Sequence, residues 1–129
     1  MEGFTTGGCI TSCKFMNTVL MRLNTEPYDQ ILSGAKTIEL RLYDEKRREL
    51  AVGDMLIFEK RDHDEQIAAQ IIALHRASSF YELLQVVDPI ACGWKVGESV
   101  DPAIMEKYYS PLDITKYGVL GIEVQVLSR

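Results

Sequence analysis

The chain has 129 residues and a formal net charge of −5, with 47% hydrophobic and 26% charged residues. This length fits one domain with a real hydrophobic core and leaves little room for two. The composition is ordinary for a folded globular protein and argues against disorder. The acidic balance argues against a protein that holds long duplex DNA or RNA on a broad basic surface. Any contact with nucleic acid must therefore depend on a local basic cluster or on a pocket for one nucleotide.

The cysteines predict neither a disulfide framework nor a metal site. Cys9, Cys13 and Cys92 are odd in number and contain no CxxC pair, and only the distant His63 and His75 could join them as ligands. That pattern is a weak zinc signal, so we expect reduced thiols in a cytoplasmic protein without a metal ion or cofactor. No apolar run approaches the roughly 20 residues that span a bilayer, so no membrane association is expected.

Regular patterning begins only after the N-terminal segment. Residues 1–15 show no period, no long apolar stretch and no early basic cluster, which argues against a signal peptide. We interpret them as a disordered tail or a cloning remnant, with Met16 as the candidate natural first residue. Residues 16–129 then form one domain without a linker, an internal repeat or a low-complexity segment.

The first elements in chain order are two strands around a short helix. Residues 19–23 form an apolar run that indicates a buried strand. Asn24 or Thr25 then caps a helix of about two turns, which Gly34 ends as glycines commonly do. Residues 36–43 alternate cleanly between apolar and polar side chains, which is the clearest strand signal in the chain.

The remaining elements are strands separated by turns and short helices. A charged loop or single helical turn is expected at 44–48, a turn at 52–54, and strands at 55–58, 66–75 and 118–127. Short helices are expected from Ser79 and from Asp101-Pro102, the second with Ile104, Met105 and Tyr108 on its inner side and its end at Ser110-Pro111. Such helices are too short for most parallel crossovers. We therefore expect an α+β fold, a small β-barrel or rolled sheet with short helices inserted around it.

The expected strand at 36–43 carries the best candidate site. Lys36, Glu39 and Arg41 lie within six residues, and Glu39 and Arg41 share one face with Cα atoms about 7 Å apart. Arginine offers a planar fork for phosphate or a base edge, and a carboxylate accepts from an amine or a ribose hydroxyl or acts as a base. The alternative is a solvated strand face whose ion pair contributes about 0–1 kcal/mol.

Two further groups each have a functional and a structural interpretation. The basic run Lys46-Arg47-Arg48, with Arg22, Lys60 and Arg61 elsewhere, is either a rim that contacts phosphate or an ordinary soluble loop. The aromatic residues Tyr108, Tyr109, Tyr117 and Trp94, together with Lys116, either stack on bases or pack in the core. The lone His75 is interpreted as structural.

The strand and its surroundings resemble the ASCH domain family. The segment Gly34-Ala35-Lys36-Thr37-Ile38-Glu39-Leu40-Arg41, and then Val52-Gly53-Asp54 before an apolar strand, is similar to the family signature G-x-K-x-x-E-x-R followed by G-D. The closing segment with Lys116-Tyr117-Gly118 also resembles that of bacterial and archaeal members. The resemblance implies a PUA-like β-barrel that binds RNA, in translation or RNA metabolism, in a cleft beside the signature strand. By position, the cleft residues are Lys36, Glu39 and Arg41, with Arg47, Tyr109, Lys116 and Tyr117 as further candidates.

Two other functions stay open beside binding of RNA or a nucleotide-like ligand. One group of ASCH-related proteins hydrolyses the amide of acetylated cytidine with a lysine, a threonine three residues later and a distant glutamate. Lys36 matches the lysine, but Glu39 occupies the threonine position. A hydrolase on a nucleoside amide or an RNA phosphodiester would use Lys36 and Glu39 as catalytic residues. The other alternative is a protein-interaction domain that uses its loops.

Overall fold

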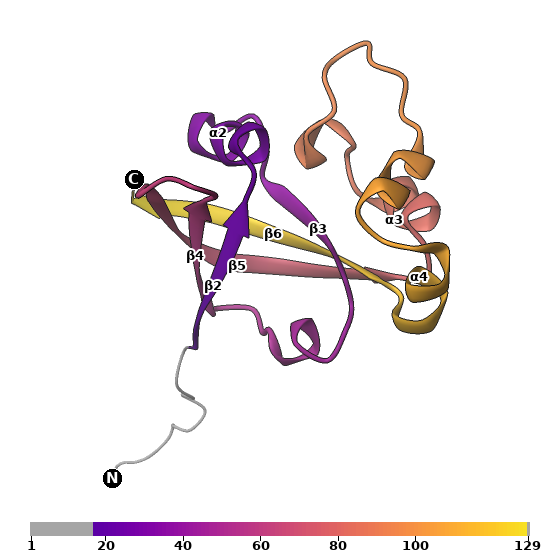
Figure 1. Cartoon of the computed structure of the whole chain (residues 1–129), viewed down its shortest axis with the longest axis horizontal. Coiled ribbons are helices and arrows are strands. Elements are labelled where there is room, and N and C mark those ends of the chain that lie inside the picture. The colour runs from indigo at the N-terminus through magenta and orange to yellow at the C-terminus, as the bar shows by residue number, and fades with distance from the viewer. Residues whose placement is uncertain (1–16, 129) are drawn as a thin grey trace, which may run out of the picture.

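One curled sheet of five strands carries the fold, in the order β2-β4-β5-β6-β3 (Figure 1). The structure is a computed structural model that describes residues 17–128. The interpretation of residues 1–15 as a tail, the start at Met16, and the thiols of Cys9 and Cys13 lie outside these described residues.

Strands and short helices alternate along the chain, as the α+β prediction requires. The strands are β2 (Thr18–Leu23), β3 (Ile38–Leu42), β4 (Met55–Lys60), β5 (Gln66–Ala77) and β6 (Val119–Ser128). The α-helices are α2 (Thr25–Ser33), α3 (Phe80–Val86) and α4 (Pro111–Tyr117), and the 3₁₀ helices are η1 (Arg47–Glu49), η2 (Ile90–Cys92) and η3 (Pro102–Lys107). In the described part of the chain, no helix has the length and apolar character to cross a membrane.

The sheet is mixed and leaves two free edges. β2 runs parallel to β4, whereas the pairs β4–β5, β5–β6 and β6–β3 are antiparallel. β2 and β3 therefore lie at opposite edges of the order, and the curl turns these edges toward each other. The barrel-like sheet expected from the sequence is confirmed as a half-barrel with a seam between β2 and β3.

The first hydrophobic core lies between the inner face of the sheet and α2. Its buried residues come from four strands, α2 and Leu50: Met21, Leu23, Tyr28, Ile31, Leu50, Leu56, Phe58, Ile67, Ala69, Ile71, Leu120, Ile122 and Val124. α2 has the predicted boundaries, because Asn24 precedes it and Gly34 ends it at a φ of 88°, where a side chain would be strained. The helix thus closes over the core at the point where the chain enters β3.

The second core lies on the opposite face of β3 and β6. α3 and the segment from η2 to η3 cover it, and its buried residues are Ile38, Leu40, Leu42, Phe80, Leu83, Leu84, Val87, Cys92, Met105 and Val119. The predicted cap of α3 is confirmed, because the Ser79 hydroxyl accepts a hydrogen bond from the Glu82 amide at 3.2 Å. Figure 1 shows α3 and α4 together at one end of the long β5–β6 pair, with α2 apart from them. β3 therefore packs one face on this core and presents Glu39 and Arg41 on the other.

The expectation of a buried strand at 19–23 is wrong in part. β2 is an edge strand whose residues alternate, so Met21 and Leu23 are buried while Leu20 is 50% exposed. Its short apolar run has the composition of a fully buried strand, and composition alone does not reveal an edge.

The expected helix after Asp101-Pro102 also differs from the structure. It is the 3₁₀ helix η3, and Met105 is buried whereas Ile104 and Tyr108 are exposed, because a 3₁₀ turn does not keep the α-helical face. Ser110 does more than end this element. Its hydroxyl accepts from the Asp113 amide at 3.1 Å and caps α4, a helix that the sequence analysis missed.

Two neighbouring isoleucines test the register of β5. Ile71 is fully buried in the first core, whereas Ile72 is 45% exposed. Ile71→Ala is expected to lower the free energy of unfolding by about 2–5 kcal/mol because it leaves a cavity. Ile72→Ala removes the same atoms and should cost about 0–1 kcal/mol. Urea denaturation measures both, and equal losses would contradict the register.

Candidate functional site

A cleft of about 560 Å³ opens beside the seam between β2 and β3. It is lined by the end of β2, by α2, by β3 and by the segment 92–109: Arg22, Leu23, Asn24, Glu26, Pro27, Gln30, Lys36, Glu39, Leu40, Arg41, Arg61, Cys92, Gly93, Trp94, Glu98, Ile104, Met105, Lys107, Tyr108 and Tyr109. Its volume lies within the roughly 300–1,000 Å³ of typical small-molecule sites.

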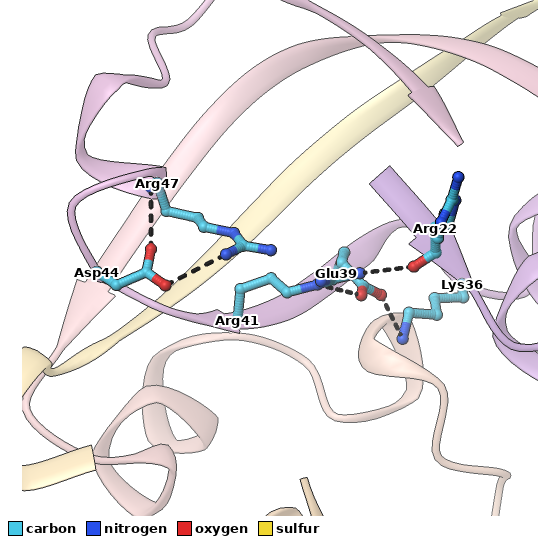
Figure 2. Close-up of polar contacts among 6 residues, drawn as sticks. All are labelled: Arg22, Lys36, Glu39, Arg41, Asp44 and Arg47. Carbon is cyan, nitrogen blue, oxygen red and sulfur yellow. Dashed lines mark hydrogen bonds and ion pairs between the residues drawn. The ribbon is translucent and has the colours of Figure 1, made fainter. Parts of the chain in front are cut away.

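A carboxylate held between two cations lies at the floor of the cleft (Figure 2). The Glu39 Oε2 atom accepts a hydrogen bond from Arg41 Nε at 2.8 Å, and Lys36 Nζ lies 3.0 Å from Oε1. The three side chains are only 7% (Glu39), 16% (Arg41) and 10% (Lys36) exposed. The alternative of a solvated strand face is therefore wrong, because the curl of the sheet turns this face of β3 inward.

The chain path before β3 places Lys36 beside this carboxylate. The Lys36 amide donates to the Gln30 carbonyl at 3.0 Å, and the Thr37 amide donates to the Ala91 carbonyl at 2.8 Å. The backbone is thereby fixed between α2 and η2 as it enters the strand. In the strand itself, successive side chains alternate, so Glu39 and Arg41 share the face of β3 that is paired with Ile122 and Leu120 of β6.

Arg41 also joins the two edges of the half-barrel. Its Nη2 atom donates a hydrogen bond to the main-chain carbonyl of Arg22 at 3.2 Å (Figure 2). Arg22 belongs to β2 and Arg41 to β3, so one guanidinium spans the seam that no strand fills. The same side chain therefore neutralises Glu39 and holds the cleft floor together.

The charged floor keeps bonding capacity that the protein does not use. Two cations face one carboxylate, so the cluster of Lys36, Glu39 and Arg41 carries one excess positive charge. Glu39 Oε1 has an ion-pair contact with Lys36 but no directed hydrogen bond. Arg41 Nη1 donates to no group among the described residues, as its two hydrogen bonds come from Nε and Nη2. Arg41 can thus offer a donor to an anion, whereas Glu39 Oε1 is fully buried against Lys36.

The two sides of the cleft differ in chemistry. The side formed by β2, α2 and the β4–β5 turn is polar: Arg61 Nε donates to Asn24 Oδ1 at 3.0 Å, and Arg22 pairs with Glu59 while staying 64% exposed. The side formed by the segment 92–109 is aromatic and apolar, with Trp94, Ile104, Met105, Tyr108 and Tyr109. Five basic and three acidic residues line the whole cleft, so it is locally basic in an acidic chain.

Tyr109 brings a neutral hydroxyl to the cleft. Burial raises the pKa of its phenol, an effect that the charge of Arg41 partly offsets. Its ring stacks on Phe80 with centroids 6.0 Å apart and planes 21° apart, which fixes its position. The phenol therefore keeps its proton at neutral pH and can donate a hydrogen bond.

Cys92 lines the cleft without being a reactive thiol. Burial raises the pKa of Cys92 to about 11, against a smaller lowering by Lys36. The protonated thiol that results is a packing group of the second core and no nucleophile. Within residues 17–128, no three His, Cys, Asp or Glu side chains are placed to hold a metal ion together.

The residues proposed from the sequence fall into two places. Lys36, Glu39, Arg41 and Tyr109 line the cleft. The other three lie outside its lining. Arg47 donates hydrogen bonds to Asp44 from its main-chain amide at 3.1 Å and from Nη1 at 3.2 Å (Figure 2). Lys116 Nζ lies 5.0 Å from the ring centre of Tyr117, which is half-buried and packs against the second core.

Sequence reasoning missed the polar face of α2. Gln30 Nε2 donates to the Gly93 carbonyl at 3.2 Å, and a Cβ at Gly93 would lie 3.0 Å from Gln30 Oε1. Gly93, at a φ of 114°, therefore lets the segment 92–109 approach the helix and the stem of Lys36. Glu26 and Gln30, four residues apart, marked one helix face in the sequence, but nothing there told which way that face points.

Glu39→Gln tests the buried charge cluster. The substitution keeps the shape but leaves two buried cations without a counter-charge, so the free energy of unfolding should fall by about 3–5 kcal/mol. Glu59→Gln is the matched control, since Glu59 pairs with the exposed Arg22 at 3.1 Å and should cost about 0–1 kcal/mol. Chemical denaturation measures both. A loss for Glu39→Gln as small as the control's would contradict the arrangement.

Comparison with known proteins agrees with this architecture. The sequence profile of the ASCH domain matches residues 21–127. The crystal structure of the hypothetical protein PH0355 is 30% identical, with a TM-score of 0.74 over 85% of this chain and 99% of its own. The solution structure of PF0455 from Pyrococcus furiosus is also 30% identical, with a TM-score of 0.68 over 87% of this chain and 99% of its own.

A more distant structure shares the fold alone. An ASCH domain from Lactobacillus crispatus is 15% identical, with a TM-score of 0.56 over 92% of this chain and 84% of its own. No curated protein sequence matches the chain. The matched profile and the two 30% identical structures confirm the resemblance found in the sequence, and the chain belongs to the ASCH domain family.

Proposed function

We propose that the cleft binds single-stranded RNA or a nucleotide-like ligand, with one nucleotide unit seated inside it. The observation that carries this proposal is the division of the cleft: a charged floor, a polar side that carries Arg22 and Arg61, and an aromatic side, within about 560 Å³. A nucleotide combines an anionic phosphate, a polar sugar and a flat base. Each part thus has a matching surface in one cleft, and the ASCH resemblance leads to the same class of ligand.

We assign the phosphate of the ligand to the polar side of the cleft. Arg22 and Arg61 reach it from β2 and the β4–β5 turn, and each uses only its Nε atom in a contact within the described residues. Their terminal nitrogen atoms, with Nη1 of Arg41 below, remain as donors for phosphate oxygens. Because Arg22 is 64% exposed, its contribution will be sensitive to salt.

The aromatic side is the place for the base. Tyr108 is 63% exposed although it is a large aromatic residue, and Trp94 lies on the same segment of the cleft. Stacking of a base on an aromatic ring contributes about 1–3 kcal/mol and tolerates any base. The hydroxyl of Tyr109 then supplies a donor for the sugar or the base edge.

Binding fits the floor better than hydrolysis does. A lysine that attacks an amide must have a free amine, whereas Lys36 Nζ lies 3.0 Å from Glu39 Oε1 and is engaged in an ion pair. Glu39 is likewise paired with two cations, Lys36 and Arg41. It also stands where the amidohydrolase pattern has a threonine. The acidic net charge also disfavours a long duplex, so we assign the site to a single strand or a free nucleotide.

Substitution of Tyr108 and of the equally exposed Tyr81 tests the aromatic side of the cleft. Tyr108→Ala should weaken the binding of a labelled single-stranded RNA about 5- to 100-fold, because it removes a stacking surface. Tyr81→Ala is the control: Tyr81 is also 63% exposed but lies on α3, outside the cleft lining. Fluorescence anisotropy at low and moderate salt measures both affinities.

The control decides how a loss is interpreted. Equal effects of the two substitutions, or RNA affinity that Tyr108→Ala leaves unchanged, would contradict binding in the cleft. Thermal denaturation of each variant checks that the fold is intact, and neither exposed side chain supports either core.

A further inference from the structure

A second cationic cluster lies beyond the cleft, around the ring of Tyr43. The Cζ atom of Arg76 lies 4.1 Å from the ring centre, and that of Arg48 lies 5.1 Å from it. The three residues come from β5, from the turn after β3 and from η1, so the fold brings them together from separate segments. We call Tyr43, Arg48 and Arg76 the arginine–tyrosine stack.

The two arginines of the stack keep their charges unneutralised. Arg48 Nε donates to the Tyr43 carbonyl at 3.1 Å, and neither Arg48 nor Arg76 forms an ion pair within residues 17–128. Both side chains are exposed. A guanidinium that contacts a ring through its face retains its N–H donors for another partner. In a chain of net charge −5, two guanidinium groups on one ring form a local concentration of positive charge that could attract an anion.

The stack continues the inner face of the sheet from the cleft. Arg41 of β3 and Arg76 of β5 both pair with Leu120 of β6, so the three side chains share one face. With adjacent strands about 4.8 Å apart, the Cα atoms of Arg41 and Arg76 lie about 10 Å apart.

Arg47 lies on the same side of the molecule as Arg41. In Figure 2 its guanidinium extends toward Arg41, and its buried Nε atom has no hydrogen-bond partner. Its charge also acts on the phenol of Tyr109 in the cleft. Basic groups therefore run from the cleft floor through Arg47 toward the arginine–tyrosine stack.

We propose that the arginine–tyrosine stack is a second phosphate site, which holds the backbone of a single-stranded nucleic acid as it leaves the cleft. This inference rests on the proposed function, since the cleft seats one nucleotide and the stack binds a phosphodiester of a flanking one. The second site distinguishes two classes of ligand. A mononucleotide meets the cleft alone, whereas an oligonucleotide meets both the cleft and the stack.

Arg76→Gln tests the second site by comparing a mononucleotide with a short single-stranded RNA. Loss of one phosphate contact should lower the salt dependence of RNA binding by about 0.7 in log K against log salt, which is about fivefold in affinity at 0.1 M salt. Adenosine monophosphate should bind as it does to the wild type. Lys95→Gln, an equal charge change at an exposed position in neither the stack nor the cleft lining, should leave the slope unchanged.

Arg48→Gln provides an independent second variant, and thermal denaturation confirms that each protein is folded. If both arginine variants keep the wild-type RNA affinity and salt slope, the second site is overturned. A loss of RNA affinity in Tyr108→Ala would then still support the cleft. Equal effects of Arg76→Gln and Lys95→Gln would also overturn it, as a general charge effect. Wild-type protein that binds neither ligand would overturn the cleft, and the second site with it.

Discussion

The arrangement of this domain depends on one buried carboxylate. Glu39 lies on the inward face of an edge strand, where an unpaired charge would be costly, and it is stable there because Lys36 and Arg41 both contact it. Arg41 in turn reaches across the seam to the main chain of β2. The charge balance and the cleft floor therefore depend on a single set of contacts, and one of these contacts also ties the two edges of the half-barrel together.

The same contacts give a small acidic domain a local positive charge. The floor retains one positive charge after Glu39 is neutralised, and the free arginine donors lie around it. The Glu39 carboxylate prevents the cleft from being uniformly cationic. In the proposed function, binding strength comes from a few directed contacts, whereas a broad basic surface would attract any polyanion.

Local sequence patterns were sufficient for most of the fold, and the family resemblance was needed to point to the candidate residues at the cleft floor. The alternation in 36–43 and the glycine at 34 predicted β3 and the end of α2, and the signature residues led to the cleft floor. What local patterns do not contain is the curl of the sheet. That curl turns Glu39 inward, and the strand order, which local patterns do not contain either, puts β2 at an edge of the sheet. The helix α4 was missed because Ser-Pro both ends one element and begins the next.

The central claim is that a nucleotide occupies the cleft between the charged floor and the aromatic side. Trp94 is the single tryptophan, so its indole N–H gives one recognisable signal in an NMR spectrum of ¹⁵N-labelled protein. On titration with adenosine monophosphate, the signals of the Trp94 indole and the Arg41 Nε–H group should shift together, while the amide of Tyr81 on α3 stays in place. Unchanged Trp94 and Arg41 signals at saturating nucleotide would contradict the account.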